Sequence, residues 1–155
     1  MTRLSQELWA DSRDIVESCL RHPFVSGLAD GSLSSERYAR FMAQDAFFLD
    51  VYARAYAAGV YRATDPQARR AWHELQSGVF EELKLHAAAA EKLGIDLIRV
   101  IPLDATRAYA DFLLSNTFGG TVGELVAAMA PCDRLYQFLG QSLAQEGRPS
   151  DAYSS

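Results

Sequence analysis

The segment from Asp65 to Gly94 constrains the fold of this chain more than any other part of the sequence. Asp65 precedes Pro66, a pair typical of a helix start, because aspartate caps the first turn and proline is tolerated at the first helical position. Gly94 is a residue type that commonly follows the last turn of a helix. Apolar residues recur at helical spacing between these signals, so the sequence predicts one long helix here.

Four further segments carry helical patterns, and no segment shows a convincing strand pattern. These expected helices cover 4–20, 34–62, 104–116 and 121–145. The first should stop at His22-Pro23, because proline disfavours helix in the residue before it, and a turn should follow at 29–32. Thr121 and Glu124 fit a capping box at the start of the last helix. Long helices joined by short loops predict an antiparallel bundle.

The composition fits one globular domain and argues against two classes of partner. A chain of 155 residues with 49% apolar residues has the size of one domain with its own core. A net charge of −5 without a cluster of Lys and Arg argues against nucleic-acid binding. No apolar run is long enough to cross a membrane, and the start does not resemble a signal peptide. We therefore expect a cytoplasmic protein with a helical domain over 1–146 and a polar tail over 147–155.

A carboxylate falls within the apolar stripe of the helix expected over 34–62. Asp45 lies at helical spacing from Phe41, Phe48 and Leu49. A carboxylate among aromatic side chains costs roughly several kcal/mol unless it is paired or hydrogen-bonded. Two interpretations stay open: Asp45 forms a hydrogen bond or ion pair with another helix, or it lines a pocket and holds an amine or amidine ligand.

A cysteine lies on the inward face of the helix expected over 121–145. Cys132 shares this face with Tyr136, because the two residues are four apart. Pro131 removes the hydrogen bond to the carbonyl of Ala127 and should kink the helix. The thiol is either a buried packing residue or a nucleophile beside this irregularity.

Glu82 and His86 lie four residues apart at the edge of the apolar stripe of the long helix. A pair of this kind can supply metal ligands in a bundle, but such sites usually need further ligands from other helices. The sequence favours a hydrogen bond within the helix instead, and we expect no metal and no cofactor. Cys19 is interpreted as a packing residue, and Tyr109 as a core residue whose hydroxyl reaches a polar edge.

Several stretches, taken in order, resemble the TenA or thiaminase II family. They are His22-Pro-Phe-Val with Leu28-Ala-Asp-Gly-Ser-Leu33, Phe41-Met-Ala-Gln-Asp-Ala-Phe-Phe-Leu49, Glu82-Leu-Lys-Leu-His86 with Lys92-Leu-Gly-Ile95, Tyr109, and Ala130-Pro-Cys-Asp-Arg-Leu-Tyr136. Each stretch alone is weak, whereas their order and spacing together are fairly specific. The resemblance extends from about Leu8 to Tyr153.

This resemblance implies a haem-oxygenase-like helical bundle that binds no haem. It also implies a hydrolase of thiamin salvage, which converts 4-amino-5-aminomethyl-2-methylpyrimidine, or thiamin itself, to hydroxymethylpyrimidine. The partners that it implies are the small pyrimidine and further copies of the chain, since the family is usually oligomeric.

The site residues of the family fall on five positions of this sequence. The cysteine that attacks the pyrimidine ring falls on Cys132, and the aspartate that binds the ring nitrogen and amino group falls on Asp45. The aromatic residues of the pocket fall on Phe48, Tyr109 and Tyr136.

The sequence also departs from the family pattern. Phe48 lacks the hydroxyl often found at its position, and Arg134 stands where an aromatic residue is common. The later helices of the family, with a glutamate that donates and accepts protons, have no counterpart, so we expect an incomplete bundle. A non-catalytic pyrimidine-binding or regulatory protein is therefore the alternative to the hydrolase. A metal-dependent oxidase using Glu82 and His86 is a third hypothesis.

Overall fold

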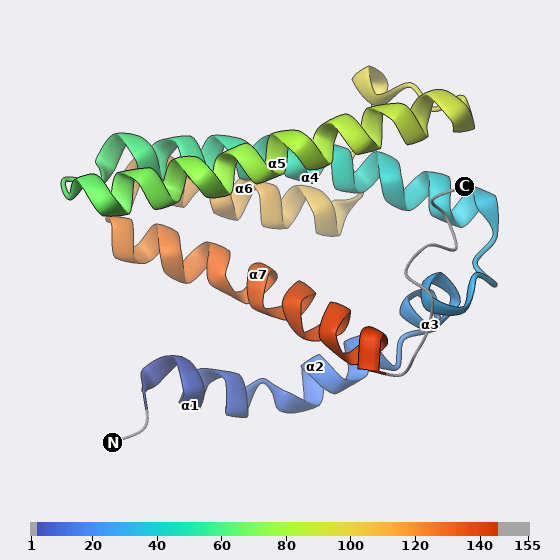
Figure 1. Cartoon of the computed structure of the whole chain (residues 1–155), viewed down its shortest axis with the longest axis horizontal. Helices are drawn as coiled ribbons and strands as arrows, with labels where there is room; N and C mark the ends of the chain where they lie inside the picture. Colours follow the sequence, from blue (N-terminus) through green and yellow to red (C-terminus); the bar gives the residue numbers. More distant parts are fainter. Residues whose placement is uncertain (1–2, 146–155) are drawn as a thin grey trace. The chain divides into compact units, whose positions relative to one another are not determined.

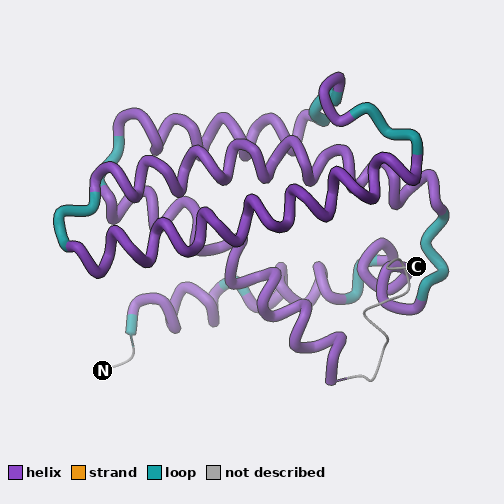
Figure 2. The backbone as a smooth tube through the Cα atoms, turned by 45° about the horizontal axis from the view of Figure 1, so that its top comes forward, coloured by secondary structure: helices purple, strands orange, loops and turns teal. Residues whose placement is uncertain are grey.

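The computed structural model describes residues 3–145, which form helices joined by short connections (Figure 1 and Figure 2). The helices are α1 (Leu4–Asp11), α2 (Arg13–Leu20), α3 (Pro23–Asp30), α4 (Ser35–Arg62), α5 (Pro66–Leu93), the 3-10 turn η1 (Leu97–Arg99), α6 (Asp104–Gly119) and α7 (Val122–Gln145). No strand occurs in residues 3–145, so the predicted all-helical class is confirmed. Within the same range, every helix falls short of the length or hydrophobicity that a membrane span requires. The tail predicted over 147–155 lies outside the described residues.

The helices divide into two compact units. The larger unit consists of residues 35–131, which include α4, α5, η1, α6 and the first part of α7. The smaller unit combines α1, α2 and α3 with the part of α7 that begins at Cys132. The predicted extent of the helical domain, 1–146, stays a prediction.

Two long helices form the frame of the larger unit. α4 and α5 run antiparallel side by side, and α6 packs against α4 (Figure 1 and Figure 2). Residues at helical spacing along α4 are buried, because an amphipathic helix turns one apolar face toward its neighbours. The buried residues of this face include Met42, Ala46, Leu49, Tyr52, Ala55, Tyr56 and Gly59.

The boundary signals at Asp65-Pro66, at Gly94 and at Thr121 are confirmed in the larger unit, whereas α6 ends at Gly119 and not at the predicted position 116. The Asp65 carboxylate accepts a hydrogen bond from the Ala68 amide at 2.7 Å, with Pro66 at the first helical position of α5. Gly94 ends this helix with φ of 68°, a left-handed conformation that glycine adopts at little cost. At the start of α7, Thr121 Oγ1 accepts from the Glu124 amide at 3.2 Å, and the Glu124 carboxylate accepts from the Thr121 amide at 2.7 Å.

The single helix predicted over 4–20 is wrong, because α1 and α2 are separate. Ser12 lies between them with φ of −88° and ψ of 1°. Its hydroxyl donates to the Leu8 carbonyl at 2.8 Å, and serine side chains that bond the backbone in this way compete with regular helix.

The sequence also failed to predict α3. Pro23 does exclude helix from His22, but it simultaneously starts a new helix at its own position. The His22 Nδ1 accepts a hydrogen bond from the Phe24 amide at 3.2 Å and so caps α3. Gly31, with φ of 75°, ends the helix inside the predicted turn.

A glycine sets the closest approach of α4 and α5. A Cβ atom on Gly59 would lie 2.3 Å from the nearest ring atom of Trp72, a separation that no real Cβ tolerates. The Trp72 ring also packs on Tyr56, with 5.8 Å between the ring centroids. The indole therefore fills the space that the missing side chain leaves.

We predict that Gly59→Ala lowers the free energy of unfolding by about 1–3 kcal/mol, because the added methyl overpacks a rigid indole. Gly78→Ala is the matched control, since no atom lies within 4 Å of the added Cβ on α5. This control should raise the stability by up to about 1 kcal/mol through helix propensity. Urea unfolding followed by circular dichroism measures both values. Equal effects at the two positions would contradict the packing argument.

Candidate functional site

An ion pair links the two long helices of the larger unit. Asp45 on α4 places Oδ2 at 2.7 Å from Nε2 of His86 on α5. The Asp45 side chain is 12% exposed and that of His86 is 10% exposed. The other ring nitrogen of His86, Nδ1, lies 3.0 Å from the backbone carbonyl oxygen of Glu82. Both ring nitrogens therefore have an oxygen acceptor.

This environment favours the charged form of the imidazole. The hydrogen bond with Asp45 raises the pKa of His86 above 6.5, and the Glu82 carbonyl and the two nearby carboxylates act in the same direction. Burial opposes the rise, because it penalises the charged ring. The pKa of the Glu82 carboxyl is itself raised, first by burial and then by the Asp45 charge, while His86 lowers it.

Asp45 and His86 each form a hydrogen bond of the kind that the sequence suggested. Asp45 has a partner on another helix, and His86 makes a hydrogen bond within its own helix, to the backbone of Glu82 rather than to the carboxylate. Only one oxygen of Asp45 takes part. Oδ1 of Asp45 makes no hydrogen bond. Every fully buried side-chain nitrogen or oxygen in residues 3–145 has a hydrogen-bond partner. Oδ1 is therefore not fully buried, and part of its surface is accessible to solvent.

Asp45, Glu82 and His86 also offer three ligand atoms within 4.8 Å of one another. A histidine that binds a metal is neutral and presents a lone pair. Here both ring nitrogens face oxygen acceptors, which is the arrangement of a charged imidazole. The predicted absence of a metal stays a prediction.

Aromatic rings lie next to the Asp45 carboxylate in sequence and on the same helix face. Phe48 follows Asp45 by three residues on α4, which places both on one face. Its ring centroid lies 5.2 Å from that of Tyr109 on α6 and 5.3 Å from that of Tyr52. Phe48 and Tyr109 are half-buried, so part of each ring is accessible. The larger unit thus combines a carboxylate with a cluster of partly accessible aromatic rings.

Two tyrosine hydroxyls of this cluster bind the first part of α7. Tyr109 donates to the Ala128 carbonyl at 3.0 Å, and Tyr52 donates to the Met129 carbonyl at 2.8 Å. These carbonyls lie in the turn that precedes Pro131, so the tyrosines fix that turn on the larger unit. The contact of Tyr52 with α7 was not predicted from the sequence. The position of Tyr52 one turn after Phe48 was the available signal.

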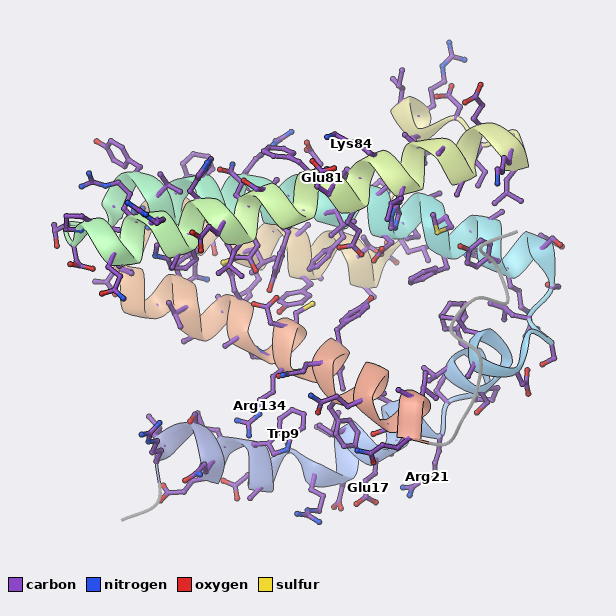
Figure 3. All side chains as sticks on the ribbon, in the orientation of Figure 1. Trp9, Glu17, Arg21, Glu81, Lys84 and Arg134 are labelled. Atoms are coloured by element: carbon purple, nitrogen blue, oxygen red, sulfur yellow. The ribbon has the colours of Figure 1, made fainter. Side chains whose placement is uncertain are left out.

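Cys132 and Tyr136, the remaining predicted site residues, belong to the smaller unit. Cys132 is half-buried and Tyr136 is mostly exposed. Arg134, between them in sequence, is directed to Trp9 of α1: its guanidinium carbon lies 4.4 Å from the ring centroid (Figure 3). Arg134 Nη1 also donates to the Ser5 carbonyl at 2.6 Å. These two contacts account for an arginine where an aromatic residue was expected.

The sequence of residues 9–155 matches the model of the TENA/THI-4/PQQC family. The chain belongs to this family. A solved structure of a TenA family transcription regulator from Silicibacter superposes with a TM-score of 0.87 at 28% identity, over 98% of this chain and 69% of the other. A TenA homologue from P. horikoshii gives 0.86 at 25% identity, over 98% and 74%. The haem-oxygenase-like helical fold implied by the sequence is therefore confirmed.

Two curated relatives carry the name aminopyrimidine aminohydrolase. The protein of Halalkalibacterium halodurans is 34% identical over 140 residues, which are 88% of this chain and 62% of the relative. The protein of Helicobacter pylori is 30% identical over 147 residues, which are 92% and 68%. The chain thus spans less than two thirds of the length of the first of these relatives.

The ion pair generates a pH-dependent stability. Because the folded pKa of His86 is raised, its contribution is fully present below the unfolded pKa of about 6.5 and is lost as the pH rises through the folded value. We predict that His86→Gln costs most stability at acidic pH and progressively less toward alkaline pH. His73→Gln, at an exposed position of the same helix, is the control. A stability difference that stays constant with pH, measured by urea unfolding, would refute the charged pair.

The Tyr52 hydroxyl provides a second stability test. We predict that Tyr52→Phe lowers the free energy of unfolding by about 1 kcal/mol, because the buried bond to the Met129 carbonyl is lost. Tyr61→Phe removes a hydroxyl from a side chain exposed at the end of the same helix and should have no measurable effect. The melting temperatures of both variants are measured by thermal unfolding. Equal melting temperatures would count against the anchoring role of Tyr52.

Proposed function

We propose that this chain is a hydrolase of aminopyrimidines of the thiaminase II type, active in thiamin metabolism. The substrates are 4-amino-5-aminomethyl-2-methylpyrimidine or thiamin, and the product is hydroxymethylpyrimidine. The names of the relatives support the activity. The observation that carries it furthest is the solvent-accessible oxygen of Asp45 on the helix face that also presents Phe48, whose ring packs on Tyr109.

Asp45 suits the recognition of an aminopyrimidine. The exocyclic amino group of the ring donates hydrogen bonds, and an ionised carboxylate is an acceptor with capacity for several. A protonated ring nitrogen next to that amino group would donate to the same carboxylate, and such charge-assisted bonds are the stronger kind. The planar pyrimidine would stack on Phe48 and Tyr109, and Tyr136 would add a further aromatic contact.

Cys132 is the nucleophile of this proposal, from its position in the Pro-Cys motif of the family. The thiolate forms a bond to a ring carbon, and the electron pair displaced into the ring expels the protonated amine from the neighbouring methylene as ammonia. Water then adds to the methylene carbon and releases a proton, and the carbon–sulfur bond breaks to regenerate the thiolate. The balance is one water consumed, with hydroxymethylpyrimidine and ammonia formed.

The test compares the two cysteines of the chain. Cys132→Ala should abolish the release of hydroxymethylpyrimidine, measured by liquid chromatography, while the variant keeps its affinity for that product. Cys19→Ala is the matched control, since Cys19 is the other half-buried cysteine of the chain, and should retain activity. Turnover by the Cys132 variant at the wild-type rate would exclude the thiol as nucleophile. A wild-type chain without turnover would exclude the hydrolase.

A non-catalytic pyrimidine-binding or regulatory protein is the second candidate. The name of the Silicibacter protein, a transcription regulator, supports this alternative. Binding at Asp45 requires only residues of the larger unit, whereas turnover requires the thiol as well. Hydroxymethylpyrimidine binding without hydrolysis would decide for this candidate.

We further propose a cytoplasmic location, and the family resemblance implies association into homo-oligomers. Large apolar side chains that are more than four fifths exposed support association with further copies. They are Tyr61, Ile98, Ile101 and Phe118. Light scattering of the purified protein measures its oligomeric state.

A further inference from the structure

His86 is the one polar or charged residue that is buried among residues 3–145. Neither the aminopyrimidine contacts nor the chemistry of Cys132 assigns it a role. A histidine that only filled space in the core would need one partner for its single N–H. His86 instead has an oxygen on each side, the backbone carbonyl of Glu82 and the carboxylate of Asp45.

We propose that His86 is a positioning residue for ligand recognition: the imidazolium holds Asp45 through Oδ2 and leaves Oδ1 for an amidine-type ligand such as an aminopyrimidine. This inference rests on the proposed function, because it requires the pyrimidine to bind at Asp45.

The backbone of α5 fixes the position of the Asp45 side chain on α4 through the His86 ring. The Glu82 carbonyl belongs to the α5 backbone, which is rigid in mid-helix, and its bond to Nδ1 fixes the orientation of the imidazole ring. The opposite ring nitrogen then holds the Asp45 carboxylate at 2.7 Å. Without this contact the carboxylate could rotate about its side-chain torsions, and ordering it on binding would cost free energy.

Charge is essential to this arrangement. The imidazolium donates to both acceptors, whereas the neutral ring carries one proton and can satisfy only one of them. The titratable groups that act on His86 are Asp45 from α4 and Glu82 from its own helix, and both carboxylates favour the charged ring. Ligand affinity should therefore fall as the pH rises through the raised pKa of His86.

The experiment measures the affinity for hydroxymethylpyrimidine by calorimetry. The measurements run from about pH 6 to about pH 9, a range that includes the ordinary histidine pKa of about 6.5. His86→Gln keeps a neutral donor toward Asp45 but cannot titrate. We expect about tenfold weaker binding than wild type at the acidic end, where a charge-assisted bond is replaced by a neutral one. The two affinities should converge at the alkaline end. The affinity of His73→Gln should equal that of the wild type at every pH. The titration of the ligand itself affects all variants equally and therefore cancels in the ratio of each affinity to that of the wild type.

A second measurement needs no ligand. The ring resonances of His86 are titrated by nuclear magnetic resonance in the wild type and in Asp45→Asn. We expect the pKa of His86 to fall in the Asp45 variant, because burial then acts without the compensating carboxylate.

The outcomes separate this inference from the proposed function. An unchanged affinity of His86→Gln, or a pH-independent ratio to wild type, would overturn the positioning role alone. The same holds if the His86 titration does not respond to Asp45→Asn. Product binding with the expected pH profile but without turnover would support the positioning role and overturn the hydrolase.

Discussion

The contact between Asp45 and His86 organises both the fold and the site of the larger unit. It joins the two long helices at a place where each would otherwise bury an unpaired polar group, which is strongly unfavourable in an apolar interior. The same contact makes the carboxylate available, because it uses one oxygen and leaves the other to solvent. Stability and recognition therefore share a single interaction, and the need for a charged imidazole couples both to pH.

The aromatic cluster extends this coupling toward α7. Phe48 shares a helix face with Asp45, and its ring packs against Tyr109. The hydroxyls of Tyr52 and Tyr109 donate to carbonyls of α7. Residues that border a prospective ligand thus also hold the turn before Pro131. A substitution in this cluster should change binding and helix anchoring together, so stability has to be measured beside every change in affinity.

Much of the fold followed from local chemistry, whereas the site did not. Asp65-Pro66, Gly94 and the pair of Thr121 and Glu124 marked boundaries correctly, since capping depends on neighbouring residues only. The break at Ser12 and the helix that starts at Pro23 were not predicted, because each of these residues both ends one helix and begins another. For Asp45 the pattern showed that a partner was needed, but the partner, His86, lies 41 positions away and its identity depends on helix register. The role of Arg134 likewise required knowledge of Trp9.

The smaller unit draws its residues from both ends of the described chain, and this imposes an order on folding. Arg134 and Ser5 are 129 positions apart, so their contact closes a loop that contains the entire larger unit. During synthesis, α4, α5 and α6 can pack as soon as they are made, because their partners are close in sequence. The helices before Ser35 must wait until the second part of α7 has been synthesised. Until then Val16, which is buried in the finished fold, and Trp9, whose ring packs on Phe138, would be accessible to chaperones.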